Sequence, residues 1–186
     1  MKAMQIVSFD GPASGLRYQE APTPEPGPGE IAVDVDHAGV GYVEALFTEG
    51  LVPIDLPWTP GLEVSGRVRA LGDGVDGYRV GDAVVALTIT GGGGYGQVAV
   101  APAELVVPLP AGLDPILAAA VPANSTTALV ALEEIAHLRR GESVLVHAAA
   151  GGLGSQMGQV ARLLGAGRVV GVTRSEAKRQ EILDLG

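Results

Sequence analysis

The residues with the most specific chemistry lie in a glycine-rich turn from Ala149 to Gly154. With its first position relaxed from glycine to alanine, the turn fits the pattern G-x-G-x-x-G. Gly151 would let the backbone approach a pyrophosphate, and Gly154 would let the following helix pack closely on the preceding strand. The N-terminus of that helix would supply free N–H groups and positive potential. The turn predicts a dinucleotide site formed by Ala149, Gly151, Gly152, Leu153 and Gly154.

The residues that end the next predicted strand favour a phosphorylated dinucleotide. A site that prefers NAD usually carries Asp or Glu there, roughly 20 residues beyond the glycines, to bind the ribose 2′-hydroxyl. Thr173 occupies that place, and Arg174, Ser175 and Lys178 follow it. Cationic side chains can neutralise a 2′-phosphate through charge-assisted hydrogen bonds. The segment therefore predicts NADPH as the cofactor; the alternative is a solvated helix start with ordinary surface charges.

Both groups of residues need a βαβ unit to position them, and the sequence predicts one. The expected order is a buried strand at 143–146, the glycine turn, a helix at 155–164, a strand at 168–172 and a helix at 175–185. After Ser143 the first strand is short and apolar, which is typical of a parallel strand buried on both faces. This context favours dinucleotide binding over the alternative, a tight strand-to-helix turn that binds nothing.

The first hundred or so residues predict a β-rich region instead. Apolar and polar residues alternate at 31–36 and 62–70, and glycines separate further short strands at 83–87, 95–100 and 104–107. After Pro110 the period becomes helical: Asp114 and Pro115 predict a helix start, Pro122 interrupts that helix, and a second helix is expected at about 125–138. We place the domain boundary at this change, giving domains of residues 1–115 and 116–186.

Composition excludes several classes of protein. The 186-residue chain has 21 acidic and 12 basic residues, a net charge of -9 that would repel nucleic acid and anionic membranes. Without cysteine it has no disulfides and no thiolate ligands for zinc. The N-terminus becomes polar too soon for a secretory signal, and no stretch reaches the roughly 18 apolar residues of a membrane span. We therefore expect a cytoplasmic protein that acts on a small-molecule substrate.

Six short motifs in order resemble the medium-chain dehydrogenase/reductase superfamily, in its zinc-free quinone oxidoreductase branch, which includes zeta-crystallin-like proteins. They are residues 37–44, 60–66, 80–84, 94–97, 126–128 and 147–154, spread over the whole chain. The resemblance implies a GroES-like β-barrel domain followed by a Rossmann domain with a doubly wound parallel sheet. It also implies hydride transfer from NADPH to a quinone or an α,β-unsaturated carbonyl.

The same resemblance suggests site residues outside the glycine turn. Tyr42 follows the strand whose end faces the active site in this family, so it is a candidate donor to the substrate; the alternative is a tyrosine with its hydroxyl in water. Thr127 matches a position near the nicotinamide, and Glu63 is expected to be structural. Gly41 and Glu44 depart from the Asn and Asp that are common in relatives. No metal site is expected from the three histidines.

A full member of the family continues well beyond Gly186, so the Rossmann domain is expected to be incomplete, and a two-stranded parallel sheet cannot cover both of its faces. A homodimer or the missing C-terminal portion could cover them. Three hypotheses follow: an NADPH-dependent quinone or enone reductase, a truncated non-catalytic fragment that acts as a binding module, and an enoyl reductase acting on carrier-bound acyl chains. The first is favoured.

Overall fold

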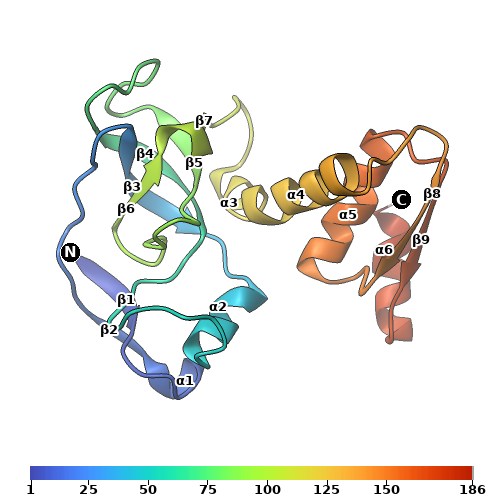
Figure 1. The fold of residues 1–186 in the computed structure, drawn as a ribbon, viewed down its shortest axis with the longest axis horizontal. Coiled ribbons are helices and arrows are strands. Elements are labelled where there is room, and N and C mark those ends of the chain that lie inside the picture. Colours follow the sequence, from blue (N-terminus) through green and yellow to red (C-terminus); the bar gives the residue numbers. More distant parts are fainter. Residues whose placement is uncertain (186) are drawn as a thin grey trace. The chain divides into compact units, whose positions relative to one another are not determined.

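The computed structural model describes residues 1–185, and the chain divides into two compact units, Met1–Pro122 and Ala123–Gly186. The first unit is built mainly from antiparallel strands, and the second alternates helices with a pair of parallel strands (Figure 1).

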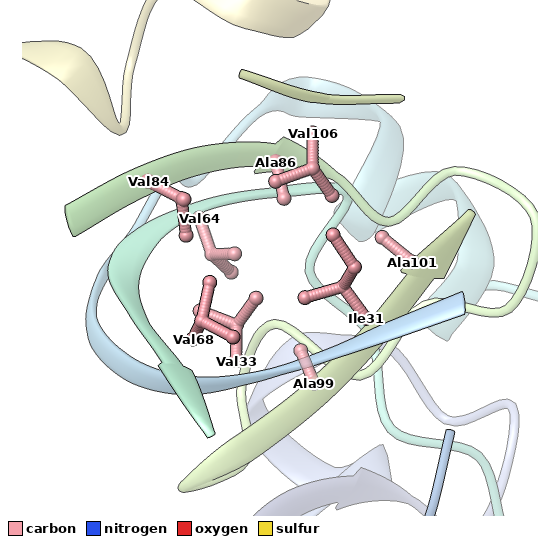
Figure 2. Packing of buried hydrophobic residues seen from close by; sticks show 9 residues of the cluster. All are labelled: Ile31, Val33, Val64, Val68, Val84, Ala86, Ala99, Ala101 and Val106. Carbon is pink, nitrogen blue, oxygen red and sulfur yellow. The ribbon is translucent and has the colours of Figure 1, made fainter. Parts of the chain in front are cut away.

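A five-stranded antiparallel sheet forms the body of the first unit, with its strands in the order β6-β3-β4-β5-β7. Their bounds are β3 Glu30–Ala38, β4 Glu63–Leu71, β5 Ala83–Leu87, β6 Val98–Pro102 and β7 Val106–Pro108. Alternate residues of these strands turn inward to form one apolar core (Figure 2). The core residues are Ile31, Val33, Val64, Val68, Val84, Ala86, Ala99, Ala101 and Val106. The alternating pattern in the sequence therefore predicted the inner face of this sheet correctly.

Two strand predictions in this region were partly wrong. The strand expected at 95–100 begins only at Val98, because Tyr95 and Gly96 belong to a loop whose N–H groups bond to Pro60 O and Gly93 O. The strand expected at 104–107 starts as a 3-10 turn, Ala103–Leu105, and only Val106–Pro108 pairs with β5.

A hairpin at the N-terminus was not predicted. Strands β1 (Lys2–Ile6) and β2 (Leu16–Glu20) pair in antiparallel fashion, with the short helix α1 (Pro12–Gly15) between them. Helix α2 (Tyr42–Thr48) was also missed. Both elements contribute to a second apolar cluster of Ile6, Phe47 and Leu62, in which the rings of Phe47 and Trp58 lie 4.7 Å apart.

Two helices follow β7 along the chain. Asp114 caps α3 (Pro115–Ala118) as predicted, because its carboxylate accepts a hydrogen bond from the N–H of Ile116 at 2.9 Å. Helix α4 (Pro122–Leu129) begins at Pro122 rather than near Ser125, since a proline at the first helical position needs no N–H partner. It continues as a wider π-helical segment, Val130–Ile135.

The second unit contains the predicted βαβ arrangement. Strands β8 (Ser143–His147) and β9 (Arg168–Val172) run parallel, and α5 (Gly152–Leu163) packs against both of them (Figure 1). Helix α5 starts three residues earlier than predicted, because Gly152 and Gly154 already belong to the helix and only Gly151 stays extended. The final helix is split into a 3-10 turn, Glu176–Lys178, and α6 (Arg179–Asp184).

Candidate functional site

The first turn of α5 is a set of backbone donors that no side chain caps. Its N-cap residue is Gly151, which has an extended backbone (φ -83°, ψ 169°). As a glycine it has no side chain that could accept a hydrogen bond from the helix. The leading N–H groups of an α-helix have no partner within the helix. Gly152, Leu153 and Gly154 therefore present donors at the positive end of a 12-residue helix. This arrangement can bind the oxygens of a phosphate group.

The turn before α5 has a constrained backbone. Ala148 adopts a left-handed conformation (φ 51°), which is unfavourable for an alanine. Two hydrogen bonds hold it: the N–H of Gly151 donates to Ala148 O at 2.8 Å, and the N–H of Ala149 donates to Val172 O at 3.0 Å. The second bond ties the turn to the carboxyl end of β9. Strain maintained by surrounding contacts is common at ligand sites.

Gly154 is required by close packing inside this turn. A Cβ atom at position 154 would lie 2.3 Å from Ala148 O and 2.8 Å from Ala149 Cα. Any side chain would therefore push the first turn of α5 away from the residues that follow β8. The sequence predicted a close approach between helix and strand; the atoms that impose it belong to the turn immediately after the strand.

A hollow of about 560 Å³ lies where β8 and β9 end. Five of the predicted cofactor residues line it: Gly151, Thr173, Arg174, Ser175 and Lys178. The remaining lining residues are His147, Ala148, Ala150 and Val172. Its volume falls in the range of small-molecule sites. The structure thus brings together the glycine turn and the basic segment that the sequence placed about 20 residues apart.

The polar groups around this hollow differ in their availability. The hydroxyl of Thr173 accepts a hydrogen bond from the N–H of Ser175 at 3.3 Å. Arg174 and Lys178 form no ion pair within the part of the chain that the structure describes, residues 1–185. The hollow therefore offers two uncompensated cations and no carboxylate in its lining, which suits an anionic group.

Other predicted cofactor residues lie beside this hollow rather than in its lining. Ala149 is buried and, with Gly154, borders a smaller hollow that also includes Arg179. Gly152 and Leu153 form the first turn of α5, where the amide nitrogen of Asn124 would lie 3.1 Å from a Cβ atom at Gly152.

The two predicted substrate-side residues belong to different units. Tyr42 is the first residue of α2, and its side chain is 80% exposed. Thr127 lies in α4 of the second unit, where its hydroxyl donates to Ala123 O at 2.6 Å within the helix. The roles assigned to both residues remain predictions.

The sequence did not predict a group of buried polar residues in the first unit. Glu44 and Glu63 are both more than nine-tenths buried. One oxygen of Glu44 accepts from the N–H of Gly41 at 2.9 Å and so caps α2. The hydroxyl of Tyr95 and the Nδ1 atom of His37 are buried without a hydrogen-bond partner in the described residues. Burial raises the pKa of Tyr95, and the charges of Glu44 and Glu63 raise it further.

Two kinds of site are not found in the described part of the chain. Residues 1–185 contain no cluster of three or more His, Cys, Asp or Glu side chains that could hold a metal ion. None of the helices that the structure describes is both long and apolar enough to cross a membrane.

A family model described as "Alcohol dehydrogenase GroES-like domain" matches residues 27–111. The chain is 37% identical over 186 residues to the mouse (Mus musculus) "Synaptic vesicle membrane protein VAT-1 homolog-like", covering 99% of this chain and 44% of the relative. It is 35% identical over 188 residues to the rat (Rattus norvegicus) "Quinone oxidoreductase", covering all of this chain and 56% of the relative.

The solved structure of a mycobacterial protein complexed with NADPH matches with a TM-score of 0.89 and 34% identity, over the whole chain and 56% of that structure. The chain thus spans about half the length of the relatives it matches. These matches confirm the predicted fold class, a GroES-like β domain followed by part of a Rossmann domain.

Proposed function

We propose that this chain, which belongs to the medium-chain dehydrogenase/reductase superfamily, is part of an NADPH-dependent oxidoreductase. The enzyme reduces a quinone or an α,β-unsaturated carbonyl and uses no zinc. The observation that carries this proposal is the hollow at the ends of β8 and β9. There the N-terminus of α5, which no side chain caps, lies beside Arg174 and Lys178, which form no ion pair within residues 1–185.

The helix end suits the pyrophosphate of a dinucleotide. Gly151 leaves the N–H groups of α5 uncovered, and Gly154 allows the turn to stay close to the helix. Phosphate oxygens accept hydrogen bonds from such N–H groups, and the helix dipole adds a favourable potential. We assign Ala149, Gly151, Gly152, Leu153 and Gly154 to this function.

The basic residues suit the 2′-phosphate that distinguishes NADPH from NADH. Arg174 and Lys178 line the same hollow as the turn, and Thr173 stands where an acidic residue would repel that phosphate. Ser175 provides a further hydroxyl at the hollow. The mycobacterial structure that holds NADPH supports this choice of cofactor.

The proposed chemistry needs no metal. When bound, NADPH supplies a hydride, and the acceptor must already be electron-poor, as quinones and enones are. The chain lacks cysteine, and the described residues contain no cluster suited to zinc. Its own side chains then have to orient the acceptor, exclude water and donate a hydrogen bond to the carbonyl oxygen. Tyr42 and Thr127 are proposed contacts on the substrate and nicotinamide sides.

Nucleotide titration tests the cofactor assignment. We expect the protein to bind NADPH more tightly than NADH by calorimetry. Lys178→Ala should weaken NADPH binding by about 10-fold, the effect of one charge-assisted hydrogen bond, and leave NADH binding unchanged. Arg168→Ala is the matched control, because Arg168 begins β9 and does not line the hollow. Equal affinity for the two nucleotides would contradict the role of Lys178.

An assay of NADPH oxidation tests the reaction. We expect turnover with 1,4-benzoquinone or cyclohex-2-enone. Faster turnover with a crotonyl thioester would favour the alternative of an enoyl reductase that acts on carrier-bound chains. A folded protein that binds neither nucleotide would exclude the enzyme and support the non-catalytic binding module.

A further inference from the structure

His147 is the first polar residue at the carboxyl end of β8, directly after the apolar residues 144–146. In open parallel sheets, ligands bind just beyond the carboxyl ends of the strands. Strand pairing places His147 opposite Val172, the last residue of β9, so their backbones lie one strand spacing, about 4.8 Å, apart. Arg174 follows Val172 by two residues. The register of the two strands therefore brings His147 beside the basic segment.

The imidazole of His147 is accessible. Neighbouring residues of a strand face opposite sides of the sheet. Val146 is buried and borders the smaller hollow together with Ser155 and Gly158 of α5, whereas His147 is exposed. Within residues 1–185 the imidazole forms no hydrogen bond and no ion pair. A ligand can therefore reach the ring and bind to it without breaking an existing bond.

The charged residues that line the same hollow as His147 are all basic. They are Arg174 and Lys178, and no carboxylate belongs to the lining. The other polar groups contributed by the segment after β9 are the uncharged hydroxyls of Thr173 and Ser175, and the turn before α5 contributes only alanine and glycine. An anion bound in this hollow would favour the protonated form of the imidazole, because opposite charges at short range stabilise each other.

We propose that protonated His147 binds the 2′-phosphate of the dinucleotide as a third cation beside Arg174 and Lys178, which makes the affinity for NADPH depend on pH. This inference rests on the proposed function and describes the regulation of the same site. Histidine ordinarily changes its charge between about pH 5 and pH 8. Binding transfers one proton from the buffer to the imidazole, and no other covalent bond forms or breaks. The added affinity is present at low pH and is lost as the pH rises and the bound imidazole loses its proton.

The central test compares wild-type protein with His147→Gln at about pH 6 and about pH 8.5, on either side of the range in which histidine titrates. Glutamine keeps a polar side chain and carries no charge. The probe is NADP⁺, which has the same 2′-phosphate as NADPH, and calorimetry measures its affinity. A phosphate monoester itself titrates near pH 6, so the result is expressed as the ratio of the wild-type to the variant affinity, in which that titration cancels.

We expect this ratio to be about 10 at the lower pH, the effect of one charge-assisted hydrogen bond, and less than about 2 at the higher pH. With NAD⁺, which lacks the 2′-phosphate, the two proteins should bind equally at both pH values. His137→Gln is the matched control, because His137 is also exposed in the second unit but does not line the hollow. It should leave the affinity for NADP⁺ unchanged.

Proton NMR observes the imidazole directly. The His147 signal, identified by its loss in His147→Gln, should titrate at higher pH with NADP⁺ bound than in the protein alone. A ratio that does not change with pH, or an imidazole titration that NADP⁺ leaves unchanged, would overturn the role of His147 and leave the cofactor assignment intact. An equal effect with NAD⁺ would overturn the contact with the 2′-phosphate. If the wild-type protein binds neither nucleotide at either pH, both this inference and the proposed function are overturned.

Discussion

The strands of the two units are buried to very different degrees. In β4 of the first unit, residues 63–66 and Val68 are buried. In β9 of the second unit no residue is fully buried, and Val170 and Val172 are 37% and 39% exposed. Apolar composition alone therefore does not determine burial; the arrangement of strands does.

The difference follows from the two kinds of sheet. The five antiparallel strands of the first unit direct one face towards a common core, so alternate residues are enough to fill it (Figure 2). Parallel strands carry apolar residues on both faces and need a covering layer on each. We infer that packing determines the stability of the first unit, whereas ligand binding contributes a larger share in the second.

The largest predicted effect tests the packing side of this comparison. Ile31→Ala should lower the free energy of unfolding by about 2–5 kcal/mol, because Ile31 is fully buried and its truncation leaves a cavity. Leu145→Ala in β8 should change it by less than about 1 kcal/mol, because Leu145 is 59% exposed.

Urea unfolding can follow the first variant through Trp58, the chain's single tryptophan, which lies in the first unit. Hydrogen exchange of β8 amides follows the second variant. An equally large loss in Leu145→Ala would mean that β8 is covered in solution.

A second prediction concerns the second unit and its ligand. Gly154→Val should abolish measurable NADPH binding and destabilise the turn by about 1–3 kcal/mol, the usual effect of overpacking, because its Cβ would lie 2.3 Å from Ala148 O. Gly158→Ala is the matched control in the same helix. Its Cβ would meet only Val169 Cγ1 at 3.9 Å, so we expect retained binding and a stability gain of up to about 1 kcal/mol.

Calorimetric titration with NADPH measures the binding, and hydrogen exchange of α5 measures the local stability. If Gly154→Val keeps its affinity for NADPH, the turn does not hold the pyrophosphate. If it also destabilises the first unit, the two units do not respond independently.

The sequence was most informative where a local pattern determines structure. The strands at 83–87 and 168–172 and the Asp114 cap follow from residue period and side-chain chemistry, and all three were correct. Lys2–Ile6 was missed because its residues mix polar and apolar types without a clear period. The seven residues of α2 are too few to establish a helical period.

The candidate site shows the same limit. The glycine turn and basic segment were recognisable because a single βαβ unit specifies their spacing. The ring of Tyr95 lies against Gly61, and the charges of Glu44 and Glu63 raise its pKa; these residues are distant in sequence, so no local pattern indicates this environment. The motif at 94–97 identified the segment but not the environment of its side chain.

The smallest predicted effects contrast two helix N-termini, one in each unit. Asp114 already satisfies the N–H of Ile116, so Asp114→Ala should cost about 1 kcal/mol of stability and leave nucleotide affinity unchanged. Gly151, at the N-cap of α5, has no side chain. In Gly151→Asp the new carboxylate would cap the helix, but the new Cβ atom would lie 3.2 Å from Ala148 O. Because these two effects oppose each other, we expect the free energy of unfolding to change by less than about 1 kcal/mol. The same carboxylate would occupy the phosphate donors and repel the ligand, weakening NADPH binding. Thermal unfolding and calorimetry on both variants check this contrast. Unchanged NADPH affinity in Gly151→Asp would show that the free end of α5 does not receive the phosphates.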